Sequence, residues 1–247
     1  MDVGLSFDVP TEKDPRKEAL LKYNKIVFIG CSRNENKDAH TVPKFMKEHG
    51  YEIACVNPFA EEDILGAPTF KTISDVPDEF LEIIDVFRPS EDIPKIVDEI
   101  IESGKIPKVF WMQDGIRSEY ARKRLEPLGV TVIEDSCIMR KYMELFVQKD
   151  PIYESILRFA RAYARAQGFV LNPDPEKLDE IISGLAYNQK KHGFRYCPCR
   201  PLSGDPKEDA KKICPCFWHR EEIKRDGHCH CGLFWDPEAA ESYPHER

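Results

Sequence analysis

Three pairs of cysteines near the C-terminus constrain this chain more than any other feature. Each pair has the spacing Cys-x-Cys, and the pairs lie in "YCPCRP" (196–201), "ICPCFW" (213–218) and "GHCHCG" (227–232). In an extended segment, residues i and i+2 point the same way with their backbones about 7 Å apart, and a proline between them restricts φ. The two thiols of a pair therefore need not serve one metal. One thiol can be a ligand while its neighbour stays free to react.

Six thiols in residues 197–231 divide naturally into four ligands for a 4Fe-4S cluster and one redox-active pair. Zinc is the alternative, either as a four-cysteine site with two spare thiols or as a two-zinc site that uses all six. The usual Cys-x(2-4)-Cys spacing of zinc sites is missing from the array, which favours iron and sulfide.

Composition and charge limit the remaining possibilities. At 247 residues and 41% hydrophobic content, the chain can build two domains of ordinary size. The first 24 residues show no signal-peptide pattern, and no run of 18 apolar residues occurs, so we expect neither secretion nor membrane insertion. We expect a reducing cytoplasm, where cysteines are ligands or catalytic thiols.

The charge is unevenly shared along the chain. Residues 1–137 hold 18 basic and 27 acidic side chains, a net charge of −9, whereas residues 138–247 hold 18 and 17, a net charge of +1. Nucleic-acid binding requires a basic face, so the acidic N-terminal half argues against a nucleic-acid partner.

The N-terminal half alternates between strand-like and helix-like patterns. Five runs rich in Val and Ile and bounded by turn residues lie at 25–30, 51–57, 83–87, 108–113 and 130–135. This alternation predicts an α/β fold with a doubly wound, Rossmann-like parallel sheet of five strands. In one connecting helix we predict Ser90 as the N-cap and an apolar face that begins at Ile93.

The turn residues after these strands predict a ligand site, because ligands bind such sheets at the carboxyl ends of the strands. Gly30 would let the backbone approach a phosphate, Ser32 and the following amides would hold it, and Arg33 and Arg88 would supply charge. No G-x-G-x-x-G motif occurs, which argues against a nicotinamide or flavin dinucleotide.

Five segments in order, "GCS", "VNPF", "IIDVFRPSEDIP", "VFWMQDGI" and "EDSCI", resemble the coenzyme A (CoA)-binding Rossmann domain family over residues 25–145. Members of that family are first of all binding modules. The resemblance implies a CoA site lined by Gly30, Cys31, Ser32, Arg33, Asn57, Phe87, Arg88, Gln113 and Gly115. Cys31 and Cys137 are predicted to be small buried side chains; the alternative is that one of them faces the ligand thiol.

The pattern after residue 146 changes to helices alone, at 151–168 and 174–193. The predicted N-caps, first residues and terminating glycines are Asp150, Pro151 and Gly168, then Asp174, Pro175 and Gly193. We therefore divide the chain into a CoA-binding domain, 1–148, and a small, mainly α iron-sulfur domain, 149–247.

The ordered Cys-Pro-Cys, Cys-Pro-Cys and Cys-His-Cys array, with the preceding "GLAYNQKKHGFRYCPCR", resembles the catalytic subunit of ferredoxin:thioredoxin reductase. The interval at 217–228 is longer than in that family. The resemblance implies a cluster held by Cys197, Cys214, Cys216 and Cys229, an active disulfide of Cys199 and Cys231, and proton transfer by His230. We expect His219 and His228 on the surface.

Together the resemblances imply an enzyme, a disulfide oxidoreductase with a ferredoxin or similar one-electron donor. A disulfide takes two electrons, so the cluster would hold the one-electron stage. The expected substrate is a CoA-containing disulfide or persulfide, because a fused CoA site raises the concentration of a linked thiol at Cys199. The alternatives are a reductase of thioredoxin-like proteins with CoA as regulator, and a non-catalytic iron-sulfur sensor of the CoA redox state.

Overall fold

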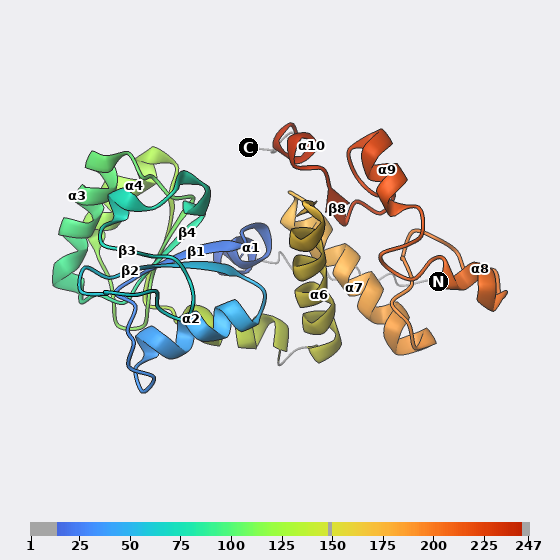
Figure 1. Cartoon of the computed structure of the whole chain (residues 1–247), viewed down its shortest axis with the longest axis horizontal. Helices are drawn as coiled ribbons and strands as arrows, with labels where there is room; N and C mark the ends of the chain where they lie inside the picture. The colour runs from blue at the N-terminus through green and yellow to red at the C-terminus, as the bar shows by residue number, and fades with distance from the viewer. Residues whose placement is uncertain (1–13, 148–149, 244–247) are drawn as a thin grey trace, which may run out of the picture.

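The computed structural model describes residues 14–147 and 150–243. These two ranges form an α/β lobe and a lobe of helices and loops, which lie side by side along the long axis of the molecule (Figure 1). The predicted boundary between residues 148 and 149 lies outside the described residues.

The first lobe is built on a six-stranded sheet in the order β3-β2-β1-β4-β5-β6, with every neighbouring pair parallel. Its strands are β1 (Lys25–Ile29), β2 (Glu52–Val56), β3 (Thr69–Phe70), β4 (Ile83–Val86), β5 (Val109–Met112) and β6 (Thr131–Ile133). The predicted Rossmann-like sheet is confirmed, and each of the five predicted runs contains a strand. The prediction of five strands missed β3, which is an edge strand of only two residues and leaves no alternating pattern.

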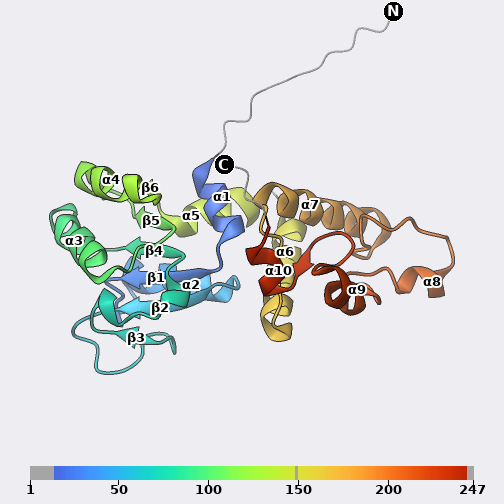
Figure 2. The same ribbon diagram turned by 90° about the horizontal axis from the view of Figure 1, so that it is seen from above.

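Helices cover both faces of this sheet (Figure 2). They are α1 (Pro15–Lys22), α2 (Asp38–Glu48), α3 (Ile93–Ser103), α4 (Glu119–Leu125) and α5 (Ile138–Tyr142). Alternate residues of β1 enter two different cores: Ile26 and Phe28 pack with α1, α2 and α5, whereas Val27 and Ile29 pack with α3 and α4. Because both faces are buried, the strand reads as a continuous apolar run in the sequence.

The prediction that Ser90 caps α3 is wrong. Ser90 starts a 3-10 turn, and α3 begins at Ile93 without any side-chain cap. The Ser90 hydroxyl instead accepts a hydrogen bond from the backbone N–H of Arg117 at 3.2 Å. Pro94 occupies the second position of α3 and has no N–H for a cap to receive.

The second lobe starts with the two predicted helices, α6 (Pro151–Gln167) and α7 (Pro175–His192). The predicted caps are confirmed: Asp150 and Asp174 each accept two backbone N–H groups, and each helix ends at a glycine with φ near +72° or +81°. Shorter elements follow, namely α8 (Pro206–Ala210), α9 (His219–Asp226), α10 (Pro237–Glu241) and an antiparallel pair, β7 (Val170–Leu171) with β8 (Phe234–Trp235).

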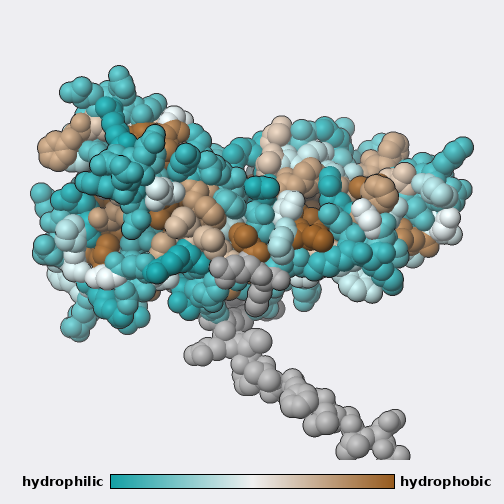
Figure 3. Space-filling view, turned by 90° about the horizontal axis from the view of Figure 1, so that it is seen from below, coloured by the Kyte–Doolittle hydropathy of each residue, from teal (hydrophilic) through white to brown (hydrophobic). Residues whose placement is uncertain are grey.

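The surface contains no continuous apolar band on the face drawn in Figure 3, where hydrophobic spots are scattered among hydrophilic residues. Among the helices of the described ranges, none combines the length and the hydropathy that a membrane span requires.

Helix α6 joins the two lobes at the amino ends of the strands (Figures 1 and 2). Arg161 is 2% exposed; its guanidinium lies 4.2 Å above the Tyr51 ring and donates to the Tyr51 hydroxyl at 2.9 Å and to the Leu20 carbonyl. One turn later Arg165 forms an ion pair of 3.1 Å with Glu52, the first residue of β2. The carboxyl edge of the sheet therefore faces away from the second lobe.

Replacement of Arg161 by Ala is expected to lower the free energy of unfolding by about 2 to 4 kcal/mol, because it removes the buried hydrogen bonds to Tyr51 and Leu20 and the packing on the Tyr51 ring, and opens the lobe interface. Thermal unfolding should shift down by roughly 5 to 10 °C. Arg158→Ala is the matched control, since this side chain on the same helix is 48% exposed, and its effect should stay within about 0.5 kcal/mol. Equal shifts for both variants would contradict the assignment of Arg161 to the interface.

Candidate functional site

The three cysteine pairs lie on turns that short backbone ladders bring together. The first two turns run antiparallel, with the Cys197 N–H donating to the Lys212 carbonyl at 2.8 Å and the Cys214 N–H donating to the Arg195 carbonyl at 3.0 Å. The third turn is closed by a 2.9 Å bond from the Cys229 N–H to the carbonyl of Phe234 in β8. Residues far apart in sequence thus form one six-thiol centre.

Burial divides the six thiols into two sets. Cys197, Cys214, Cys216 and Cys229 are 3 to 5% exposed. Cys199 and Cys231 are only partly buried. The partly buried thiols are the two that the sequence resemblance implies as the redox pair, and the buried set is the one it implies as ligands.

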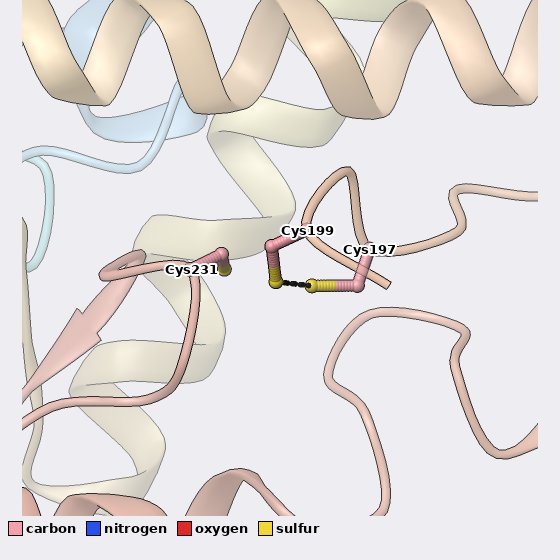
Figure 4. A group of neighbouring side chains, drawn as sticks. All are labelled: Cys197, Cys199 and Cys231. Carbon is pink, nitrogen blue, oxygen red and sulfur yellow. Dashed lines mark hydrogen bonds between the residues drawn. The ribbon is translucent and has the colours of Figure 1, made fainter. Parts of the chain in front are cut away.

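Three of the sulfurs approach one another closely. The Sγ atoms of Cys197, Cys199 and Cys231 lie within 4.8 Å of one another and point toward a common centre (Figure 4). The Cys197 and Cys199 sulfurs are 3.0 Å apart, and the Cys231 sulfur is 3.7 Å from the Cys229 sulfur. This group mixes one expected ligand with both expected redox thiols. Its spacing also suits a single tetrahedral metal ion, since Zn–S bonds of 2.3 Å place sulfurs about 3.8 Å apart.

Hydrogen bonding makes these thiols unequal. Thiol hydrogen bonds from Cys197 and Cys231 hold the pKa of Cys199 well below its usual range, and nearby His230 and Arg200 act in the same direction. The hydrogen bond between Cys197 and Cys199 raises the pKa of Cys197, and the contact with Cys197 likewise raises the pKa of Cys231. Within the group, Cys199 is the thiol that the surroundings favour as a thiolate.

The buried set fits an iron-sulfur cluster. It offers four thiols, and the backbone N–H of Phe234 donates to the Cys229 sulfur at 3.4 Å. A hydrogen bond from Cys197, together with the adjoining Arg200 guanidinium, lowers the pKa of Cys216 to about 6. N–H donors and a cation beside sulfur are the surroundings that stabilise thiolate ligands.

Glu222 of helix α9 binds both loops that carry the expected redox cysteines, Cys199 and Cys231. This residue was not identified from the sequence. This carboxylate is 9% exposed, forms an ion pair with Arg200 and accepts the His230 N–H at 3.0 Å. Arg200 follows Cys199 directly and His230 precedes Cys231, so one side chain positions both loops. The only sequence signal was the longer interval at 217–228.

The expectation that His219 lies on the surface is wrong. It is 8% exposed, and its ring nitrogens contact the Cys216 carbonyl at 2.5 Å and the Tyr163 hydroxyl at 2.6 Å. Burial lowers the pKa of His219, so the ring is a neutral link between the cysteine turn and α6. His228 is partly buried against Trp235, with ring centroids 4.5 Å apart, whereas His230 is exposed.

The residues expected to bind CoA gather at the carboxyl edge of the sheet, after β1, β2, β4 and β5. The Gly30 N–H donates to the Val56 carbonyl at 2.9 Å, and the Phe87 N–H donates to the Ile29 carbonyl at 3.0 Å. A Cβ on Gly30 would lie 3.2 Å from the Arg88 side chain, and its φ is +92°, so glycine is required at this turn. Ser32 is partly buried, and Gly115 is exposed and donates its N–H to Asp135 at 2.7 Å.

Three members of the expected CoA set turn their side chains away from this edge. Cys31 is 1% and Gln113 is 5% exposed, and the Gln113 amide donates to both oxygens of Asp85 at 2.8 and 3.0 Å. Asp85 is fully buried and sequence reasoning missed it; burial raises its pKa well above the usual value. Asn57 turns inward and donates to the Cys31 carbonyl at 2.7 Å.

The two arginines of the set are exposed and already paired with acids. Arg33 lies 4.0 Å from the Glu62 carboxylate and donates to the Glu62 backbone carbonyl at 3.0 Å, and Arg88 forms an ion pair of 2.7 Å with Asp92. Pairs between exposed side chains are weak, so both guanidinium groups remain available to an anionic ligand. The contact of each of these residues with CoA stays a prediction.

A Rossmann-type lobe joined to a lobe with six clustered thiols defines a two-part protein. The chain belongs to the CoA binding domain family through residues 24–143, and residues 147–247 match the family of the ferredoxin thioredoxin reductase catalytic beta chain. Both resemblances inferred from the sequence are thereby confirmed.

Individual relatives cover about half of this chain. The uncharacterized protein YneT of Bacillus subtilis (strain 168) is 37% identical over 122 residues, which are 49% of this chain and 87% of YneT. A hypothetical protein from Pyrococcus horikoshii OT3 is 32% identical, covers 53% of this chain and 89% of its own, and has a TM-score of 0.49. A Thermus thermophilus structure is 30% identical over 54% of this chain and 99% of its own, also with a TM-score of 0.49.

Proposed function

We propose that this protein is an iron-sulfur disulfide reductase. Cys197, Cys214, Cys216 and Cys229 hold a 4Fe-4S cluster, and Cys199 and Cys231 are the redox pair. The division of six thiols into four buried and two partly buried, mutually adjacent ones supports this proposal most directly. When bound, the cluster supplies storage for single electrons from a ferredoxin or similar donor.

The chain's own residues carry the exchange chemistry. The Cys199 thiolate attacks the substrate disulfide, forms a mixed disulfide and releases one substrate thiol. Cys231 then attacks the Cys199 sulfur, so that the second substrate thiol leaves and a Cys199–Cys231 disulfide forms. Two electrons from the donor and two protons restore both thiols. His230, exposed and adjacent to Cys231, exchanges those protons with solvent.

The position of the ligand edge favours a protein disulfide as substrate and CoA as a regulator. A ligand at the carboxyl edge is separated from the second lobe by strands of four or five residues, about 13 to 17 Å. The width of α6, about 10 Å, adds to this separation. A CoA-containing disulfide held at this edge would have to span this whole separation to reach Cys199 of the same chain. Otherwise it would have to arrive from solution or from a second copy.

Turnover of the anaerobically purified protein with reduced ferredoxin tests this function. Steady reduction of a thioredoxin-type disulfide, with a rate that changes when CoA is added, is the expected result. Faster reduction of CoA disulfide than of the thioredoxin-type disulfide would instead support a CoA-containing substrate. A change of spectrum on ligand binding without turnover with either disulfide would identify a sensor and contradict the reductase.

Replacement of Arg88 by Ala is expected to weaken CoA binding by roughly tenfold to a hundredfold, because one charge-assisted phosphate contact contributes about 1.5 to 3 kcal/mol. Titration calorimetry with CoA measures the loss, and reduction of a protein disulfide without CoA should be unchanged. Arg122→Ala, a 52% exposed arginine on α4, is the control and should bind normally. Unchanged affinity combined with a lower melting temperature would show that Arg88 serves only the fold.

A further inference from the structure

A second pair of thiols lies at the ligand edge of the first lobe. The Sγ atoms of Cys31 and Cys55 are 2.7 Å apart, and the two side chains are 1% and 0% exposed. The left-handed turn at Gly30, with φ of +92°, brings the chain after β1 back over β2, and the bond from Asn57 to the Cys31 carbonyl holds it there. The sulfurs need to approach by only about 0.7 Å to reach the length of a disulfide bond.

We propose that Cys31 and Cys55 form a second dithiol–disulfide couple, which exchanges with the disulfide of a small CoA-type ligand at the carboxyl edge. This couple is separate from the six-thiol centre and acts without it, because that centre lies beyond the amino ends of the strands. Because Cys31 lies in the turn after β1, at the carboxyl edge of the sheet, the couple can react only with a ligand that carries a disulfide.

The exchange needs no oxidant or reductant other than the ligand disulfide and the two protein thiols. The Cys31 thiolate attacks one sulfur of the ligand disulfide, a Cys31–ligand mixed disulfide forms, and the first ligand thiol leaves. Cys55 then attacks the Cys31 sulfur and releases the second ligand thiol. The net result is one ligand disulfide reduced to two thiols and one Cys31–Cys55 disulfide formed, with the two protons of the protein thiols transferred to the products.

The order of the two thiols follows from their positions. Cys31 sits beside Gly30 and Ser32 in the turn, whereas Cys55 lies inside β2 with no exposed surface. Cys31 is therefore the thiol nearer to a ligand at the edge, although it is only 1% exposed, so attack requires the turn at 30–32 to open, and Cys55 resolves. The contact with Cys55 and burial both raise the pKa of Cys31, so we expect the exchange to be slow at neutral pH compared with that of an exposed thiol.

Peptide mapping of the full chain tests this couple. The anaerobic, reduced protein is incubated with CoA disulfide, quenched with acid, denatured, alkylated with N-ethylmaleimide near neutral pH, and digested with trypsin. Trypsin places Cys31 in peptide 26–33, Cys55 in peptide 48–71 and Cys137 in peptide 125–140. The expected product is a cross-linked 26–33/48–71 peptide, lighter than the two separate peptides by two hydrogens, with loss of alkylation at both cysteines. Cys137, a buried thiol of the same lobe, should stay fully alkylated after denaturation.

Two variants complete the test. Cys55→Ala removes the resolving thiol, so peptide 26–33 should retain CoA as a mixed disulfide. In Cys199→Ser the cross-link should form as in the unchanged protein, which separates this couple from the proposed reductase centre. Full alkylation of Cys31 and Cys55 in the wild-type protein, denatured after the incubation, would overturn the proposal. A cross-link that depends on Cys199 would also overturn it.

Discussion

The Cys199→Ser variant is expected to keep its metal and lose disulfide reduction. Cys199 is the partly buried thiol whose surroundings favour the thiolate, and in the proposed exchange it forms the covalent bond to substrate. Removal of such a nucleophile should lower turnover by at least about a thousandfold. Iron and sulfide analysis with a visible spectrum, together with turnover driven by reduced ferredoxin, measures both effects on one preparation.

The Cys199→Ser variant also distinguishes a 4Fe-4S cluster on the buried thiols from a single metal ion that Cys199 would help to hold. If a single metal ion were held by the close group of Cys197, Cys199 and Cys231, loss of Cys199 would remove a ligand and the metal with it. Stoichiometric zinc without visible absorption would contradict the cluster in any case. Cys137→Ser is the control, since this cysteine lies in the first lobe and should leave both iron content and turnover unchanged.

Much of the fold could be predicted because its elements carry local signals. The continuous apolar runs of β1, β2 and β4 indicate strands buried on both faces, and Asp-Pro starts with glycine stops define α6 and α7. The capping of α3 could not be predicted in the same way. Whether Ser90 caps that helix or serves the Arg117 N–H depends on a loop 27 residues away.

The cysteine array was predictable because a linear motif states both the residue types and their order. The contacts that position the array could not be predicted, because they join segments that only the folded chain brings together. Glu222 meets Arg200 across 22 residues, and His219 meets Tyr163 across 56. The contact between Cys31 and Cys55 likewise depends on the register of β1 and β2 and on the turn at Gly30.

The relation between the two lobes shows a different limit of sequence reasoning. Fusion of a ligand-binding domain to a catalytic domain predicts a high effective concentration only if the geometry lets the ligand reach the catalytic thiol. Arg161 and Arg165 instead attach the second lobe to the amino ends of the strands. The choice between substrate and regulator for CoA thus depends on interface residues that carry no motif.

The Cys214→Ser variant is expected to lose the cluster and the structure around it. Cys214 is 4% exposed and belongs, with Cys229, to the apolar core that includes Phe234. A hydroxyl is a poor replacement for a thiolate ligand. Structural thiolate–metal sites contribute on the order of 10 kcal/mol to folding, which is comparable with the whole stability of a domain.

The loss should be confined to the second lobe, where the segment between α7 and β8 contains only the short helices α8 and α9. Limited proteolysis should cut this segment in Cys214→Ser, while the first lobe resists and still binds CoA. The matched comparison is Cys199→Ser, which changes the same atom in a neighbouring turn but removes no proposed ligand. Equal loss of iron in the two variants would show that the division into ligands and redox thiols is wrong. Loss of CoA binding in Cys214→Ser would show that the two lobes unfold as one unit, because the core that contains Cys214 also contains Phe28 and Leu20 of the first lobe.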